Sequence, residues 1–267
     1  MDAFFLYGFL QRALLAGVFI AIACALLGVF LILRRDAMIG HGLAHISFAG
    51  VALGLFLNMM PLAVALFVAV AASMIIMKLK VTAGLHGDTA IAIFSSVGFA
   101  LGVLLATLSH SFNVDLFSYL FGEILAIDTS EVLFSVALAF VVLCLVVLNY
   151  HKFLYMTFDR ESAKASGVNV DRLDSLLTVL TAVTVVLGMK VVGILLVSAL
   201  VVIPAAAGLQ LAKSFKQAIG LSTSISVASV VLGLYLAFLL DLPASGSIVL
   251  LSFLAFVLLF VLRRTRK

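Results

Sequence analysis

The sequence predicts an all-α polytopic membrane protein with about nine transmembrane helices. Of the 267 residues, 65% are hydrophobic and 10% are charged, and the mean hydropathy is +1.36. An ordinary soluble domain is about half apolar and about one quarter charged, so a water-soluble globule could not bury this much apolar surface. Apolar runs close to the ~20 residues that cross a ~30 Å hydrocarbon layer recur from end to end. We therefore expect a single membrane domain over residues 1–267.

Charge clusters, glycines, prolines and short polar runs divide the apolar sequence into separate spans. Gly188, Lys190 and Gly193 separate the sixth and seventh spans so closely that one long or broken helix, and hence eight spans, is the alternative. The first span has no basic segment before it and is too long for a signal peptide, so we expect it to remain. The expected helices cover residues 4–33, 37–58, 61–79, 88–109, 131–149, 173–189, 191–211, 215–240 and 246–263.

An odd number of spans places the two termini on opposite sides of the membrane, and the basic residues indicate which side is which. With the C-terminus in the cytoplasm, fourteen of the 16 Lys and Arg residues fall on the cytoplasmic side, and Arg12 and Lys190 fall outside. An excess of Lys and Arg in cytoplasmic loops is the usual pattern. We therefore expect the N-terminus outside and the C-terminus inside. This placement accounts for the net charge of +4, and no nucleic-acid partner is expected.

Two segments do not fit simple spanning. Residues 110–130 are rich in aromatic side chains and mildly amphipathic, which predicts an outer-face loop with a short helix or a re-entrant turn. Residues 151–172 form the longest polar stretch and are expected in the cytoplasm. Within them, the stretch from Asp159 to Gly167 has the composition of a short surface helix that ends at a glycine. Such a helix would offer a docking element to a soluble partner, and a solvated loop is the alternative.

His41 and His45 are the leading candidate site. They stand four residues apart in IGHGLAHISFAGVALG, so on a helix both imidazoles project from one face. Counted from Arg35 at ~1.5 Å per residue, His41 lies about 9 Å and His45 about 15 Å from the cytoplasmic edge of the membrane. Ionisable groups at this depth are costly and usually face a pathway or a partner. The alternative is that each ring only hydrogen-bonds to a neighbouring helix.

The chemistry of imidazole favours zinc over manganese, because manganese and magnesium sites use more carboxylate oxygen. Two ligands cannot complete a tetrahedral zinc site, so a homodimer axis, another helix or water would have to supply the rest. An incomplete site suits a transporter, since an ion held too tightly would not leave. Glu123 is a candidate further ligand, and His110 and Asp115 are candidates for an outer entry station. Each of these three could equally be an ordinary interfacial polar group.

Pro204, in SALVVIPAAAG, lacks a backbone donor, which predicts a kink in its helix and a free carbonyl near Leu200. We interpret the kink as a packing feature in preference to an ion-coordinating break. The cysteines Cys24 and Cys144 lie in apolar runs without CxxC spacing, so neither a disulfide nor a thiolate metal site is expected.

Motifs for nucleotide binding and hydrolysis are absent from the sequence. It contains no G-x-x-x-x-G-K-[ST] phosphate loop, no Gly-Lys pair and no HExxH motif. We therefore expect no catalysis by this chain and no permanently bound cofactor. Any ATP hydrolysis would belong to a separate subunit.

Six blocks of sequence together resemble the permeases of bacterial zinc, manganese and iron ABC transporters, and the resemblance extends over essentially the whole chain. Their order and spacing, more than any single block, make the resemblance specific. The blocks are FLQRALLAG at 9–17, GVFLILRRDAMIGHGLAHISFAGVALG at 28–54, LFSYLFGEIL at 116–125, FDRESAKASG at 158–167, VVGILLVSALVVIPAAAG at 191–208 and DLPASGSIVLL at 241–251.

The resemblance implies a fold similar to the cobalamin and siderophore importers, in a bacterial cytoplasmic membrane. It also implies a homodimer that works with two cytoplasmic ATPase subunits and an extracytoplasmic binding protein. The coupling helix of the family would fall on the stretch that contains Asp159, Glu161 and Gly167. The metal-binding pair of the family is commonly an aspartate and a histidine four residues apart, which fall on positions 41 and 45. This sequence departs from that pattern because position 41 is His41.

These features predict a metal importer that works by alternating access, with zinc as the first choice of ion and manganese or iron as alternatives. An ion-gradient-driven carrier or channel is a second class, but it would need no coupling element and would be expected to have more carboxylates within the membrane. A receptor or scaffold without transport is a third, for which the histidine pair would have no purpose.

Overall fold

The computed structural model describes residues 7–82, 87–108, 119, 120, 122 and 128–265, and these residues are almost entirely helical. Nine of the helices in this part of the chain are long and apolar enough to cross a membrane, which confirms the nine predicted spans. The two short helices α8 and α9 connect α7 to α10. The long helices are α2 (Gly8–Leu33), α3 (Met38–Phe56), α4 (Pro61–Thr82), α5 (Gly87–Leu108), α7 (Thr129–Leu148), α10 (Val170–Val192), α11 (Ile194–Leu211), α12 (Phe215–Leu240) and α13 (Ala244–Thr265); the short helices are α8 (Tyr150–Phe158) and α9 (Arg160–Ala165).

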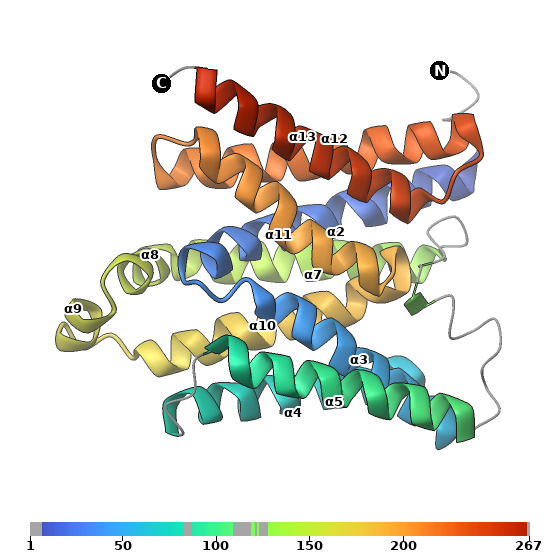
Figure 1. Cartoon of the computed structure of the whole chain (residues 1–267), viewed down its shortest axis with the longest axis horizontal. Helices are drawn as coiled ribbons and strands as arrows, with labels where there is room; N and C mark the ends of the chain where they lie inside the picture. The colour runs from blue at the N-terminus through green and yellow to red at the C-terminus, as the bar shows by residue number, and fades with distance from the viewer. Residues whose placement is uncertain (1–6, 83–86, 109–118, 121, 123–127, 266–267) are drawn as a thin grey trace.

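The long helices lie roughly side by side and form a layered bundle (Figure 1). Helix α2 is central and packs against α7, α11 and α12, while α3 packs against α4 and α5 on the other side of the bundle. The start of α2 and the end of α13 lie at opposite ends of the bundle, and α8 and α9 lie at the same end as the end of α13. This arrangement agrees with the predicted topology, in which the C-terminus and residues 151–172 share one side of the membrane.

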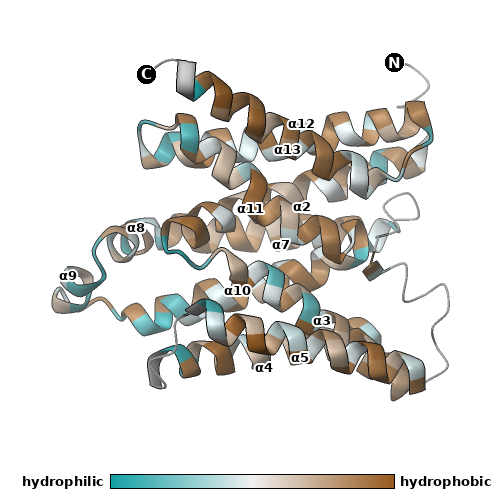
Figure 2. Cartoon of the chain, in the orientation of Figure 1, coloured by the Kyte–Doolittle hydropathy of each residue, from teal (hydrophilic) through white to brown (hydrophobic). Residues whose placement is uncertain are grey.

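The distribution of polar residues also fits a membrane protein. Apolar residues dominate the long helices, and polar residues gather on α8, α9 and the first turns of α10 (Figure 2). Three buried hydroxyl groups of α10 are satisfied within their own helix: Thr178, Thr181 and Thr184 each donate a hydrogen bond to the carbonyl four residues earlier. Such bonds matter because the hydrocarbon layer offers polar groups no water.

The sixth and seventh spans are two separate helices, so the eight-span alternative is wrong. Gly193 joins α10 to α11 with a φ of +87°, a conformation that a residue with a side chain adopts only under strain. Its N–H donates to the carbonyl of Met189 at 2.9 Å, and its carbonyl accepts from the N–H of Val197 at 3.0 Å. A single residue therefore ends one helix and begins the next, and α11 returns towards the end from which α10 came (Figure 1).

Two helix ends differ from the predicted bounds by two or three residues because of capping groups. Helix α10 begins at Val170, since the side chain of Asn169 accepts a hydrogen bond from the N–H of Arg172 at 3.1 Å. Helix α7 begins at Thr129, where the N–H of Asp128 donates to the carboxylate of Glu131 at 3.2 Å. Hydropathy marks the edge of an apolar run, whereas a cap extends the helix into its polar flank.

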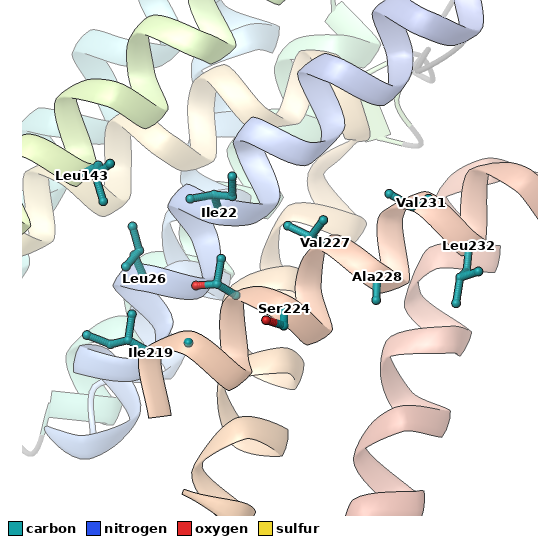
Figure 3. Close-up of a pocket in the computed structure, with 11 residues that line it drawn as sticks. Ile22, Leu26, Leu143, Ile219, Ser224, Val227, Ala228, Val231 and Leu232 are labelled. Carbon is teal, nitrogen blue, oxygen red and sulfur yellow. The ribbon is translucent and has the colours of Figure 1, made fainter. Parts of the chain in front are cut away.

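An apolar groove of about 860 Å³ lies between α2, α7 and α12 (Figure 3). Hydrocarbon side chains such as Ile22, Leu143 and Val227 line most of it, and Thr223 and Ser224 add hydroxyl groups. The lining contains no carboxylate, imidazole or thiol, so the groove is not a site for a metal ion.

Candidate metal site

His41 and His45 project from one face of α3 and approach each other closely, as the sequence predicts. Their Nε2 atoms are 3.1 Å apart, and the two rings meet edge to face with centroids 4.6 Å apart. Two nitrogen ligands at ~2.0–2.1 Å from a tetrahedral zinc ion are about 3.3–3.4 Å apart. A small opening of the pair would therefore allow both nitrogens to bind one ion.

Close packing of α3 against its neighbours fixes the direction of this face. A Cβ atom on Gly50 would lie 2.5 Å from the backbone of Ala65 in α4, so the two helices are in backbone contact there. On the side of α5, a Cβ atom on Gly98 would lie 3.0 Å from the Cα of Ile46. Small residues allow this approach between membrane helices. Because α4 and α5 are both in close contact with α3, the His pair can face only the side of α3 that these two helices leave open.

Phe99 of α5 completes the surroundings of the pair on one side. Its ring meets the ring of His45 edge to face with centroids 5.2 Å apart, and it stacks on Phe48 at 5.6 Å. His41 remains exposed and His45 half-buried in the single chain. The candidate site is thus open on one side, and a titratable ring that faced lipid there would be unfavourable.

The pair is not a complete metal site by itself. Among the residues that the structure describes, no group of three or more His, Cys, Asp or Glu side chains could hold a metal ion. The other ligand candidates, Glu123, His110 and Asp115, lie outside the described residues and stay predictions. Two nitrogen ligands on one helix suit an ion that is bound and then released. A complete four-ligand site would need further ligands from another helix, a second chain or water.

The predicted surface helix between Asp159 and Gly167 is present as α9. Asp159 precedes its first residue and accepts hydrogen bonds from the N–H of Ser162 at 2.9 Å and from its hydroxyl at 2.5 Å. These bonds, above all the one from the hydroxyl, lower the pKa of the Asp159 carboxyl. Glu161 lies exposed in the first turn, and Gly167 has a φ of +83° just after the helix ends. The segment is therefore a helix and not a loop, and its role as a docking element stays a prediction.

Pro204 lies inside α11 and is buried. Its expected kink and free carbonyl near Leu200 stay predictions, as does the interpretation of the kink as a packing feature.

Comparison with known proteins identifies the family. The model of the ABC 3 transport family matches residues 6–263, which is nearly the whole chain. The chain belongs to the ABC 3 transport family. As a member of this family with nine apolar spans, it is a multi-pass protein of the bacterial cytoplasmic membrane.

Similar ABC 3 relatives carry names for different metals. The chain is 32% identical over 255 residues to the manganese transport system membrane protein MntC of Listeria innocua, and the alignment covers 96% of this chain and 91% of that protein. It is also 32% identical over 253 residues to the high-affinity zinc uptake system membrane protein ZnuB of Haemophilus influenzae, which covers 95% and 97%. These two relatives are equally similar to this chain, so they do not decide between the metals.

Solved structures show the same fold. A chain of PsaBC from Streptococcus pneumoniae, solved in complex with a Fab, matches with a TM-score of 0.87 and 33% identity over 97% of this chain and 93% of that one. An inward-facing structure of a metal-chelate type ABC transporter matches with a TM-score of 0.78 at 17% identity, over 94% of this chain and 85% of that one. The second match supports the fold alone.

A set of ion pairs at the α9 end of this ABC 3 protein was not predicted from the sequence. In the charge pattern, Arg34, Lys80 and Arg160 serve only as markers of the cytoplasmic side. In the structure they pair with Asp36, in the turn before α3, and with Asp174, near the start of α10. A signal was present, because both acids lie at the edges of apolar runs, where an unpaired carboxylate is unfavourable.

Proposed function

We propose that this ABC 3 protein is the permease of an ATP-driven importer for a divalent transition metal, and that His41 and His45 bind the ion within the membrane. One observation supports this most directly: two Nε2 atoms converge to 3.1 Å on a membrane-spanning helix. Imidazole is a common ligand of such metals, and polar groups at this depth usually mark a transport pathway.

Zinc is the proposed ion because both ligands are imidazole nitrogens, which suit zinc better than manganese. The relative named for zinc uptake supports this choice. Manganese is the second candidate, because relatives from Listeria innocua and Streptococcus gordonii are named for manganese transport or import. Iron is a further alternative within the same family.

A second copy of the chain is proposed to cover the open side of the pair. His41 is exposed in the single chain, and the apolar ring of Phe99 on α5, which contacts His45, is exposed as well. Two copies that met on this face would bury the rings and bring further ligands to the ion. A homodimer therefore accounts for both the exposure of the pair and its missing ligands.

Energy is proposed to come from cytoplasmic ATPase subunits that dock on α8 and α9, around Asp159, Glu161 and Gly167. The protruding position of these helices at one end of the bundle supports this assignment (Figure 1). Metal would arrive from an extracytoplasmic binding protein, and ATP-driven movement would switch the His pair from outward access to inward access. The chain would hydrolyse no ATP itself.

An ion-gradient-driven carrier is a weaker proposal. Such a carrier needs carboxylates that can take up and release protons within the membrane. In the described spans, the buried carboxylate of Asp174 and that of Glu131 lie near helix ends, and each is held in an ion pair. These carboxylates are therefore poorly suited to carry protons.

Zinc uptake by the purified permease with its ATPase in proteoliposomes tests the proposal. Wild type is expected to accumulate zinc only with ATP, and His41→Ala and His45→Ala are expected to lose most of this uptake. Met38→Ala is the matched control, since Met38 is an exposed residue of the same helix, three positions before His41. Unchanged uptake in both histidine variants would refute the site, and uptake without ATP would support the carrier instead.

A further inference from the structure

Asp174 is the most buried acidic side chain in the described part of the chain. It lies in the second turn of α10, and its side chain is 1% exposed. A carboxylate without water is stable as an ion only when cations neutralise it. Two arginines from different elements do so: Arg34, which caps the end of α2, and Arg160, the first residue of α9.

The two arginine contacts of Asp174 differ in kind. The guanidinium of Arg34 forms a hydrogen-bonded ion pair with Oδ1. The Nη1 atom of Arg160 lies 2.6 Å from Oδ2, which accepts no hydrogen bond, so this attraction is chiefly electrostatic. Arg160 is also half exposed, with a second and largely exposed partner in Asp171 at 3.2 Å. The contact between α9 and α10 is therefore the more easily broken of the two.

From Arg34 the contacts continue to the helix of the His pair. The Nη2 atom of Arg34 lies 3.8 Å from Oδ2 of Asp36, and Lys80 at the end of α4 pairs with the other oxygen of Asp36. The carbonyl of Asp36 accepts a hydrogen bond from the N–H of Ile39 at 3.0 Å, so Asp36 is joined to the first turn of α3. His41 follows two residues after Ile39. An unbroken series of contacts thus joins α9 to the start of the metal-binding helix.

The charges of this series balance only with α9. Arg34, Lys80 and Arg160 match the three carboxylates of Asp36, Asp174 and the exposed Asp171 of α10. Of the three cations, Arg160 is the one that α9 supplies, so a movement of α9 changes the charge around Asp174.

We infer that Asp174 is a positioning residue that transmits the movement of α9 to α3 through Arg34 and Asp36, with Arg160 as its contact on the α9 side. This inference rests on the proposed function, in which an ATPase moves α9. When α9 pulls Arg160 away, the full charge of Asp174 acts on Arg34, and the turn at Asp36 that begins α3 shifts with it. The two histidines, one and two turns further along α3, follow this shift.

The experiment measures zinc ions transported per ATP hydrolysed by the complete transporter in proteoliposomes. Arg160→Gln is expected to lower this ratio about tenfold, the size of a typical coupling loss between sites. Arg160→Lys keeps the charge and is expected to restore most of the ratio. Asp171→Asn is the matched control, because Asp171 contacts the same guanidinium but does not lead to α2, and its ratio is expected to stay within about twofold of wild type. A merely structural role would reduce transport and hydrolysis in proportion and leave the ratio unchanged, which would overturn the inference.

Hydrogen exchange provides a second measurement that needs no transport. In wild type, ATP is expected to change the exchange of the amides from Asp36 to His41, and in Arg160→Gln this response is expected to be lost. An equal response in both proteins would overturn the inference. If Arg160→Gln does not assemble with the ATPase, Arg160→Met, which keeps the apolar stem, takes its place. A wild type that moves neither zinc nor manganese on ATP would contradict the proposed function instead, so the two failures are distinguishable.

Discussion

The ring of Phe99 meets the ring of His45 edge to face across the contact between α5 and α3, with centroids 5.2 Å apart. The imidazole of His45 thus contacts two rings, that of His41 and that of Phe99. Because Phe99 is the one of the two that lies on another helix, we expect it to help hold His45 in the orientation that turns its Nε2 towards His41.

Phe99→Ala is expected to weaken zinc binding about three- to tenfold, because an aromatic pair contributes ~0.5–1.5 kcal/mol beyond the area that it buries. Zinc binding to the detergent-purified protein, measured by competition with a fluorescent chelator, checks this. Phe99→Tyr keeps the ring and should bind as wild type does. An alanine variant with wild-type affinity would show that the His pair is held without Phe99.

His41→Asp is expected to shift the preference of the site from zinc towards manganese. The substitution replaces a nitrogen ligand with a carboxylate oxygen, which manganese prefers. The dissociation constant for zinc divided by that for manganese should rise by about tenfold or more. His41→Asn adds an oxygen without a charge and separates the effect of the ligand atom from that of the charge. A ratio equal to that of wild type would mean that position 41 does not determine the ion.

Gly50→Ala is expected to destabilise the protein by about 1–3 kcal/mol, as overpacking of a close contact does. The new Cβ would lie 2.5 Å from the Cα of Ala65, so the backbones of α3 and α4 would have to separate. Gly220→Ala in α12 is the matched control, because nothing lies within 4 Å of its new Cβ, and helix propensity predicts a small gain of up to ~1 kcal/mol. Thermal unfolding in detergent compares the two. A Gly50→Ala protein as stable as Gly220→Ala would contradict the packing.

The stability of α9 is expected to depend on pH through Asp159. Hydrogen bonds from Ser162 lower the pKa of this carboxyl in the folded state, so the ionised form stabilises the helix above the pKa of the unfolded state. This contribution is lost as the pH falls through the folded-state pKa, which lies below the ordinary value of about 3.9. Hydrogen exchange of the α9 amides, corrected for the intrinsic rate, should accelerate in this acidic range. Asp159→Asn, which can cap without titrating, should show no such change.

The orientation of the chain can be tested with single cysteines in a background without Cys24 and Cys144. A cysteine in place of Met60, in the exposed link between α3 and α4, should react with an impermeant thiol reagent from outside the cell. A cysteine in place of Lys164 of α9 should react only after the membrane is opened. The reverse pattern would place α8 and α9 outside and would exclude the docking of a cytoplasmic ATPase there.

The sequence predicted the nine spans well because the hydrocarbon layer leaves a chain little choice of conformation. Each apolar run must satisfy its own backbone as a helix, so hydropathy and length are sufficient to locate it. The ends were less accurate, since side chains such as Asn169 and Asp128 cap helices beyond the apolar run. The α9 helix was also predictable, because its composition and its final glycine are local features.

The contacts between helices could not be predicted in the same way. His41 and His45 are four residues apart on one helix, so their proximity follows from the spacing alone. Phe99 is distant in sequence and reaches His45 only because glycines bring α5 close to α3. Asp174 and Arg34 are 140 positions apart and meet only in the folded bundle. A single sequence contains no information that pairs such residues.

Because Gly193 alone connects α10 to α11, no flexible linker separates the two helices. Both hydrogen-bond ladders end on this glycine, and the backbone of Gly122 lies against it so closely that a Cβ there would be 2.5 Å from its nitrogen. A change in the angle between the two helices would therefore be centred on this residue. Such a change would displace most the opposite ends of the helices, where Asp174 lies in α10 and where the link to α12 begins after α11.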